Sequence, residues 1–151
     1  MADVHTPAQR SHNMSRVRSR DTKPEMFIRS MLHKLGFRFR LHRKDLPGCP
    51  DIVLPKYRGV IFVHGCFWHK HECHLFKWPS TRQDFWKAKI NHNHKKDLES
   101  RQLLISLGWR VCTVWECSLK GPKRDHQRVS MTLEKWILSG SKQLEVVGSK
   151  G

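Results

Sequence analysis

Acidic residues are scarce in this chain of 151 residues: 13 Asp and Glu stand against 29 Lys and Arg, which leaves a formal net charge of +16. This excess of positive charge predicts a polyanionic partner. Long apolar runs are missing as well, and none approaches the ~18 residues that a membrane helix needs. The first residues also lack the apolar core of a secretory signal peptide, so we expect a cytoplasmic protein that makes no contact with a membrane.

Internal repeats and low-complexity segments are also absent from the sequence, and its length fits one domain. Hydrophobic residues make up 38% of the chain, with six Trp and seven Phe, so the protein can bury a core and fold without its partner. Five Cys is an odd number, and in a reducing cytoplasm thiols are more often metal ligands, core residues or nucleophiles than disulfides. The eleven His beside them favour a metal site.

Hydrophobic periodicity divides the chain into an arm, a body over 21–140 and a frayed tail over 141–151. Residues 1–20 hold four Arg against one acidic residue, which is typical of an arm outside the core, although a solvated flexible terminus fits equally well. The predicted elements are a helix over 22–36, strands over 37–41, 52–54, 59–63 and 109–115, a helix over 81–107 with a break allowed near Asn91, and a helix over 129–137. This order predicts an α/β fold in which helices flank a mixed sheet.

The loop that precedes the second helix is dense in Cys, His and aromatic residues. Cys66, His71 and Cys73 follow one another at close spacing, and Cys117 comes just after the fourth strand. Tetrahedral zinc binds such mixtures of thiolate and imidazole, and the bound metal supplies folding free energy. We therefore expect a structural zinc site, against the alternative of unrelated buried thiols. Spacing alone leaves the fourth ligand open, because further histidines lie within reach, namely His64, His69 and His74.

A carboxylate at a strand end gives a second signal. Asp51 follows a Pro-Gly turn at the head of a short apolar strand, next to a strand that ends in His64. Such a carboxylate can hold Mg²⁺ beside a substrate phosphate, although an aspartate near a turn is more often a turn residue. His69 and Asp97 could supply a proton acceptor and a group to orient it, which is the minimum apparatus for hydrolysing a phosphodiester. The alternative for His69 is a surface residue or a zinc ligand.

Aromatic side chains accompany the basic residues in the same region. Phe67, Trp68, Trp78 and Trp86 lie among cations, an arrangement suited to base stacking or to insertion into a duplex. Aromatic residues also fill cores, but Phe67 and Trp68 stand between expected zinc ligands rather than on a periodic face. This placement weakens the interpretation of Phe67 and Trp68 as core residues.

Several of these segments together resemble the very short patch repair (Vsr) endonucleases. They are the Pro50-Asp51 turn, VIFVHGCFWH over 60–69, HEC over 71–73, TRQDFWKAKI over 81–90, GWRV over 108–111 and VWEC over 114–117. The resemblance runs over nearly the whole chain, from about Ala2 to about Trp136. It implies a nuclease of restriction-endonuclease-like α/β fold that nicks DNA 5′ of the thymine in T:G mismatches, which arise when 5-methylcytosine deaminates.

The resemblance also implies roles for individual residues. Asp51 and the main-chain carbonyl of Val63 would bind catalytic Mg²⁺, and Glu25 would act from an outer shell. His69, oriented by Asp97, would activate the attacking water, and His64 would touch the phosphate. The structural Zn²⁺ would be held by Cys66, His71, Cys73 and Cys117.

For DNA recognition the resemblance implies a set of wedges and polar contacts. Phe67, Trp68 and Trp86 would wedge into the duplex beside the mismatch, with Met14 inserting from the minor-groove side, and Lys89 and Asn93 would contact the T:G pair. A mispaired step is cheaper to unstack, so wedges convert weak pairing into selectivity. The expected partner is double-stranded DNA with a T:G mismatch, and mismatch-repair proteins are expected as further partners. The protein is expected to bind as a monomer and to be associated with the bacterial nucleoid.

Two departures from the family pattern bear on the mechanism. Val63 replaces the usual threonine, and the acid-x-Lys signature of related nucleases is absent after Asp51, which indicates histidine chemistry in place of a lysine. Two other functions remain as alternatives: a non-catalytic zinc protein that binds nucleic acid, and a restriction-type nuclease that cuts both strands. A binding module has no need of a carboxylate beside phosphates, so Asp51 argues against the first of these.

Overall fold

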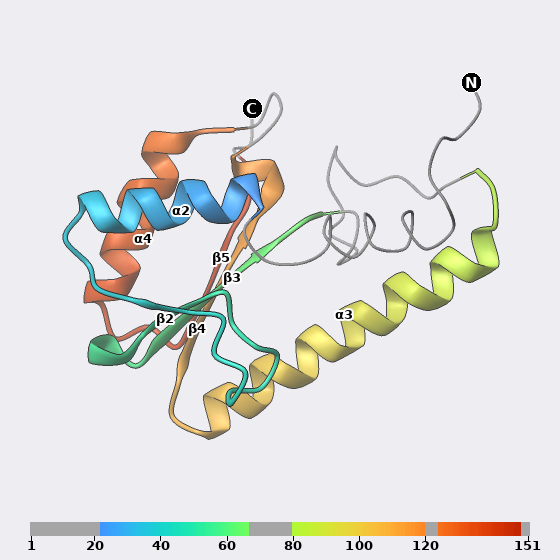
Figure 1. Ribbon diagram of the computed structural model, residues 1–151, viewed down its shortest axis with the longest axis horizontal. Coiled ribbons are helices and arrows are strands. Elements are labelled where there is room, and N and C mark those ends of the chain that lie inside the picture. The colour runs from blue at the N-terminus through green and yellow to red at the C-terminus, as the bar shows by residue number, and fades with distance from the viewer. Residues whose placement is uncertain (1–21, 67–79, 120–123, 149–151) are drawn as a thin grey trace.

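The computed structural model describes residues 22–66, 80–119 and 124–148, and the structural statements below refer to these ranges. Its helices are α2 (Lys23–Lys34), α3 (Gln83–Ser106) and α4 (His126–Leu138), and its strands are β1 (Arg40–Leu41), β2 (Ile52–Leu54), β3 (Gly59–His64), β4 (Arg110–Trp115) and β5 (Gln143–Val146). Figure 1 shows the strands at the centre, with helices on both sides.

The strands form one sheet in the order β1-β2-β3-β4-β5. β1, β2 and β3 pair antiparallel, whereas β3, β4 and β5 pair parallel. α3 connects β3 to β4 and α4 connects β4 to β5, as parallel neighbours require a crossover. This mixed sheet flanked by helices confirms the α/β class predicted from the order of elements.

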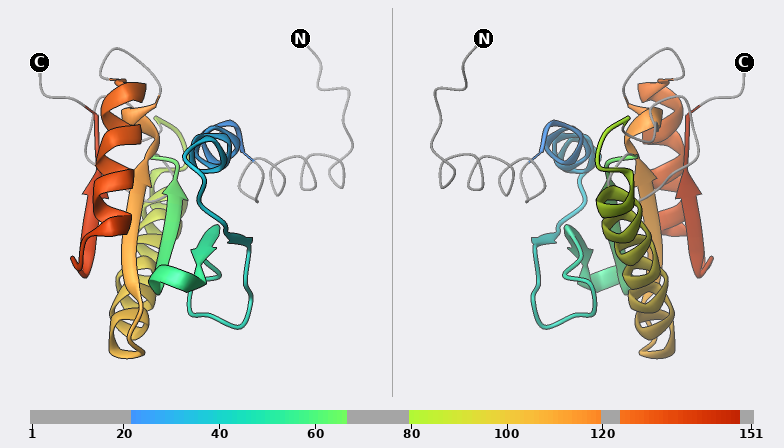
Figure 2. Two further views of the ribbon diagram at one scale, coloured as in Figure 1. Left: turned by 90° about the vertical axis from the view of Figure 1, so that its left-hand side faces the viewer. Right: turned by 90° about the vertical axis from the view of Figure 1, so that its right-hand side faces the viewer.

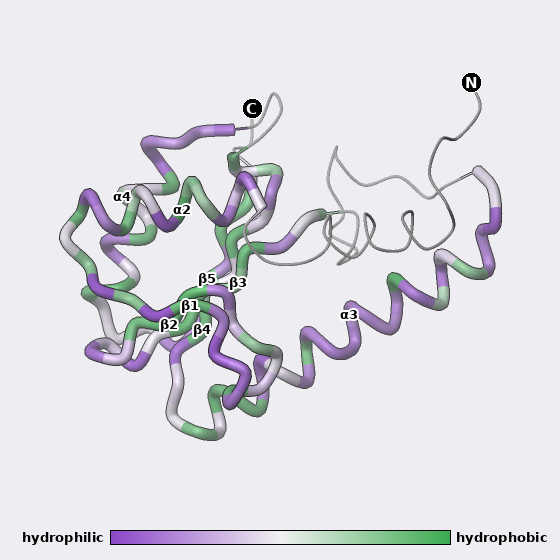
Figure 3. Tube along the Cα trace, viewed as in Figure 1, coloured by the Kyte–Doolittle hydropathy of each residue, from purple (hydrophilic) through white to green (hydrophobic). Residues whose placement is uncertain are grey.

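Each face of the sheet has its own hydrophobic core. Side chains alternate along β3, so that Ile61 packs in the cluster formed with α2 and α4, whereas Val60 and Phe62 pack in the cluster that contains Leu104 of α3. The two side views show α2 and α4 on one side of the strands and α3 on the other (Figure 2). Apolar residues concentrate in the strands, and α3 is largely hydrophilic where it continues past the sheet (Figure 3). None of the helices in the described ranges has the length and apolar character needed to cross a bilayer.

Local sequence explains how α2 begins. Thr22 is the N-cap, and its side-chain oxygen accepts a hydrogen bond from the N–H of Glu25 at 3.4 Å. Pro24 stands in the first turn, where its missing N–H costs nothing. Ile28 and Leu32 are fully buried on the same side of the helix, which fixes α2 against the sheet. This packing turns Glu25 towards the protein interior.

The tail differs from the prediction made for it. Residues 143–146 form β5, which pairs with β4 so that Leu144 lies opposite Cys112 and Val146 lies opposite Val114. Val146 is 1% exposed, and burial of its side chain together with the strand pairing offsets the entropy lost in ordering this segment. The expectation of a frayed tail over 141–151 is therefore wrong for these residues.

Two further elements differ in extent. The strand expected over 37–41 is reduced to Arg40–Leu41, which pairs with β2. α3 runs without interruption through Asn91, where a break was allowed. The cost of one asparagine inside a helix is well under ~1 kcal/mol, so the two buried residues of α3, Ile90 and Leu104, keep the helix continuous.

Candidate functional site

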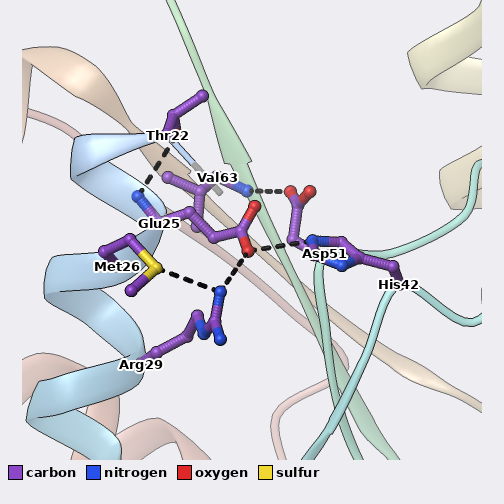
Figure 4. A network of polar contacts seen from close by, with 7 residues as sticks. All are labelled: Thr22, Glu25, Met26, Arg29, His42, Asp51 and Val63. Carbon is purple, nitrogen blue, oxygen red and sulfur yellow. Dashed lines mark hydrogen bonds and ion pairs between the residues drawn. The ribbon is translucent and has the colours of Figure 1, made fainter. Parts of the chain in front are cut away.

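A tight turn brings Asp51 to the sheet. Gly48 in this turn has a φ of +75°, and a Cβ built on it would lie 2.8 Å from the Cβ of Ser100, so the turn packs directly against α3. Asp51 comes directly before β2, and its Oδ2 accepts a hydrogen bond of 2.7 Å from the N–H of Val63 on β3 (Figure 4). The structure therefore brings together the two residues predicted to bind Mg²⁺.

The backbone geometry of β3 also determines where the carbonyl of Val63 lies. In an extended strand the N–H and C=O of one residue project to the same edge, which is why paired residues can exchange both hydrogen bonds. The N–H of Val63 points to Asp51. Its carbonyl oxygen therefore projects to the edge of β3 on which the Asp51 carboxylate lies, as a shared cation would require.

Glu25 reaches the same region from α2. Its side chain is 2% exposed, and its Oε2 lies 2.8 Å from Nε2 of His42 and 3.3 Å from Nη1 of Arg29 (Figure 4). Glu25, His42 and Asp51 each offer a ligand atom, and these atoms lie within 4.8 Å of one another. Two carboxylates and an imidazole at this separation have the donor chemistry and spacing of a divalent cation site.

Sequence reasoning found Glu25 and Asp51 but missed His42. The alternation over 37–42 placed His42 on the polar face of a half-buried strand. In the structure the strand ends at Leu41, and His42 has a φ of +48°, a left-handed conformation that turns its ring towards Glu25. Histidine adopts a positive φ more often than most residues other than glycine, but hydrophobic periodicity does not show where it does so, and therefore no sequence pattern indicates this residue.

His64 and Asp97 approach each other at the end of β3. Nδ1 of His64 lies 4.0 Å from Oδ2 of Asp97 on α3, and the two side chains are 9% and 21% exposed. The imidazole of His64 also lies edge-on against Trp115, with ring centroids 5.3 Å apart. The carboxylate predicted to orient His69 thus lies beside His64, and His69 itself is outside the described residues.

The residues predicted on α3 share one face of that helix. Trp86, Lys89, Asn93 and Asp97 follow one another at intervals of three and four residues, and each is half-buried. Most of the exposed residues in the same stretch are basic, namely Lys87, His92, His94, Lys95 and Lys96. The face that carries Asp97 towards His64 therefore also carries Trp86, Lys89 and Asn93.

Two of the four predicted zinc ligands lie in one buried cluster. Because β3 and β4 are parallel and His64 pairs with Trp115, Cys66 and Cys117 leave the sheet at the same edge. They are 0% and 1% exposed and pack together with Trp115. Cys117 Sγ accepts a hydrogen bond from the N–H of Gly148 at 3.3 Å, as a thiolate ligand would.

A third buried thiol has a different environment. Cys112 lies in the middle of β4 within the main core and is 0% exposed. Burial raises the pKa of the Cys112 thiol well above its usual range. A thiol that resists ionisation is neither a metal ligand nor a nucleophile, so Cys112 is a core residue.

The other predicted site residues lie outside the described ranges, and the structure tests none of their roles. They are Met14, Phe67, Trp68, His69, His71 and Cys73.

Known proteins similar to this chain form a consistent group. The family model described as DNA mismatch endonuclease Vsr matches residues 2–75. DNA mismatch endonuclease Vsr of Escherichia coli is 46% identical over 151 residues, covering 98% of this chain and 97% of that protein. Type II nicking enzyme V.XorIIP of Xanthomonas oryzae is 51% identical over 119 residues, covering 79% of this chain and 88% of that enzyme.

A solved structure shares the fold. The catalytic domain of homing endonuclease I-Bth0305I superimposes with a TM-score of 0.53 over 79% of this chain and all of that domain, at 21% sequence identity. At this identity the likeness concerns architecture alone. The family assignment follows instead from the relatives that are 46% and 51% identical, one of them over nearly its whole length. This chain belongs to the Vsr family of DNA mismatch endonucleases.

Proposed function

We propose that this DNA endonuclease nicks one strand of a duplex 5′ of the thymine in a T:G mismatch, in a hydrolysis that requires Mg²⁺. Such mismatches arise from deamination of 5-methylcytosine, so the nick would start very short patch repair. The observation that carries the proposal is the contact of Asp51 with the backbone of Val63 on β3, with the buried Glu25 beside it. The next residue of β3, His64, lies next to Asp97 of α3. The protein would act as a monomer, with mismatch-repair proteins as further partners.

The donors around Asp51 fit a hard divalent cation. Asp51 and the carbonyl of Val63 would hold Mg²⁺, and the buried carboxylate of Glu25 would act from an outer shell. Carboxylate and carbonyl oxygens are the ligands that Mg²⁺ prefers. When bound, the cation would stabilise the negative charge that develops on the scissile phosphate.

Histidines would provide the remaining chemistry. In the proposal His64, beside Asp97, donates a hydrogen bond to the scissile phosphate, and His69 accepts the proton of the attacking water. Asp97 would orient His69, since a carboxylate has two oxygens and can accept from more than one imidazole. These assignments explain how hydrolysis can proceed without the lysine that related nucleases place after the aspartate.

Selectivity for the mismatch would come from aromatic side chains inserted into the duplex as well as from polar contacts to the bases. Trp86 would lie beside the mismatch, and Lys89 and Asn93 would contact the T:G pair, since all three share the half-buried face of α3 with Asp97. Phe67 and Trp68 would insert from the adjacent loop. Unstacking costs least at a mispaired step, so the same wedge favours T:G over a paired duplex.

A structural zinc would join the two parallel strand ends. Cys66 and Cys117 are buried together at one edge of the sheet, and His71 and Cys73 would complete the tetrahedron. This zinc would hold the loop that carries Phe67, Trp68 and His69 in place. Its role would be in folding rather than in the reaction.

The test is a comparison of two duplexes that differ at one base pair. A labelled T:G duplex and its T:A twin are incubated with the protein, with Mg²⁺ and with chelator, and both strands are followed on denaturing gels. We expect a single nick, 5′ of the mismatched thymine, in the T:G duplex with Mg²⁺ only.

The alternatives give different products in the same assay. Cleavage of both strands would indicate a restriction-type nuclease, and binding without cleavage would indicate a non-catalytic zinc protein. Equal nicking of the T:G and T:A duplexes would contradict the proposed specificity.

A further inference from the structure

Glu25 is the least exposed acidic side chain of the candidate site, and the side chains of His42 and Arg29 hold it. Its Oε2 lies 2.8 Å from Nε2 of His42 and 3.3 Å from Nη1 of Arg29. Both contacts are made to the same oxygen, and Figure 4 shows the rest of the carboxylate turned to the side on which Asp51 lies. The pair of contacts therefore fixes the rotation of the Glu25 carboxylate relative to Asp51.

His42 is itself held from two directions. Its backbone N–H donates to the carbonyl oxygen of Asp51 at 3.1 Å, and its ring meets Glu25, so one residue links both carboxylates of the cluster. The side chain is 9% exposed. A φ of +48° is uncommon for a residue other than glycine, even for histidine, and needs a constraint from its surroundings. The antiparallel pairing of Leu41 with Ile52 supplies that constraint, because it ends directly beside His42 and Asp51.

We propose that His42 is a positioning residue of the divalent cation site, which acts by holding the Glu25 carboxylate in the orientation that the cation needs. The inference rests on the cation that the proposed function places at Asp51. A group that orients a metal ligand raises metal affinity without touching the metal, and its loss costs roughly 10- to 100-fold in affinity. His42 would act on an outer-shell carboxylate, so we expect an effect at the lower end of that range, about 10-fold. Arg29 shares the contact but lies on the same helix as Glu25, whereas His42 ties Glu25 to the sheet.

Two substitutions separate this role from the alternatives. His42→Asn retains a residue that tolerates a positive φ, but its side chain is too short to reach Glu25. His42→Gln is longer, and its amide N–H can replace the hydrogen bond of Nε2 to the carboxylate. His33→Asn is the matched control, since His33 is an exposed histidine in the last turn of α2.

The measurement is Mn²⁺ binding to the full-length, zinc-loaded protein without DNA, followed by the loss of the free Mn²⁺ signal in electron paramagnetic resonance. We expect His42→Asn to weaken Mn²⁺ binding about 10-fold, and His42→Gln to stay within about threefold of the parent. His33→Asn should bind like the parent. Thermal melting of each variant checks that folding is intact, and His42→Gln keeps the test valid if the asparagine variant melts early.

Three results would overturn the proposal. They are a parent that shows no saturable Mn²⁺ binding, a folded His42→Asn that binds Mn²⁺ like the parent, and a His42→Gln as weak as His42→Asn. The last result would mean that the imidazole nitrogen is itself a metal ligand.

Nicking of the T:G duplex, measured on the same samples over a Mg²⁺ series, distinguishes this inference from the proposed function. A parent that nicks only T:G duplexes while His42→Asn keeps full metal affinity would overturn the role of His42 alone. A parent that binds metal as expected yet nicks neither duplex would overturn the proposed function alone.

Discussion

Val63, at a position where the resemblance to the family implies threonine, contributes to the candidate site through its backbone. Its N–H donates to Asp51 Oδ2 at 2.7 Å, and its carbonyl projects to the same edge of β3. Neither group depends on the side chain. Valine also has the β-branched shape that suits a strand. The substitution of the hydroxyl therefore leaves intact every contact that the proposed cation site requires of this residue.

Asp51→Asn should abolish nicking and leave binding to the T:G duplex intact. The amide oxygen can still accept the hydrogen bond of Val63, so folding is preserved while the negative charge that would anchor Mg²⁺ is lost. Loss of several kcal/mol of charge stabilisation corresponds to a decrease in rate of about 1,000-fold or more. Single-turnover nicking and a binding titration measure the two effects separately.

Asp45→Asn is the matched control for this charge change. Asp45 lies in the preceding turn, is 62% exposed, and pairs with Arg43 at 2.6 Å. This variant should nick like the parent, since an exposed pair contributes little and lies outside the cluster around Asp51. A similar loss of nicking in both variants would assign the effect to net charge and not to metal binding.

Cys117→Ser should lose bound zinc and with it much of the stability of the fold. The thiolate would provide folding free energy directly, and loss of several kcal/mol lowers the melting temperature of a domain of this size by roughly 10 °C or more. Elemental analysis and thermal melting measure the two changes. Cys49→Ser, at an exposed turn cysteine, should retain both zinc and stability. A folded, zinc-free and active Cys117→Ser would contradict a structural zinc.

At the scale of elements, the helices and strands that were predicted correctly are those whose sequence signals lie within the element itself. The helix that begins at Thr22 has its own cap, its proline and its apolar face within one turn or two, and β3 is a continuous apolar run. β5 has only four residues, Gln143–Val146, and it is a strand because β4 offers a parallel edge beside it. β1 and the turn at His42 depend in the same way on β2. Tertiary pairing, which no local pattern reports, decided these segments.

Deletion of residues 142–151 should destabilise the protein, because β5 is part of the sheet. Val146 is 1% exposed, and the guanidinium of Arg128 on α4 donates a hydrogen bond to the carbonyl of Val147. Burial of one such side chain stabilises by roughly 1.5–3 kcal/mol, which corresponds to a fall in melting temperature of about 5–10 °C. Deletion of 149–151 alone is the control and should melt like the parent. Equal melting temperatures for both deletion variants would show that residues 142–148 add no stability, as expected of a frayed tail.

At the scale of the whole molecule, positive charge is spread along the entire chain, whereas the candidate site brings two carboxylates together. The chain carries a formal net charge of +16, yet Glu25 and Asp51 lie together beside β3. Phosphates attracted by the basic surface would meet repulsion at these two carboxylates unless a cation lies between them. DNA binding and nicking are thus expected to depend on different ions. Monovalent salt would weaken DNA binding by screening the basic surface, whereas the divalent cation would control nicking.

The arm over 1–20 should contribute to binding by two forces that substitutions can separate. Replacement of Arg10, Arg16, Arg18 and Arg20 by Gln removes phosphate contacts, so affinity for T:G and T:A duplexes should fall together. Each lost phosphate contact lowers the slope of log affinity against log salt concentration by about 0.9, so loss of all four contacts would lower this slope by about 3.6.

Met14→Ala should instead leave the salt slope unchanged and reduce the preference for T:G, because it removes an apolar wedge and no charge. Binding of both variants to both duplexes over a salt series measures slope and preference together. An unchanged salt slope in the arginine variant would indicate that the arm is a solvated terminus that makes no phosphate contacts. An unchanged preference for T:G in Met14→Ala would indicate that Met14 has no role in mismatch recognition.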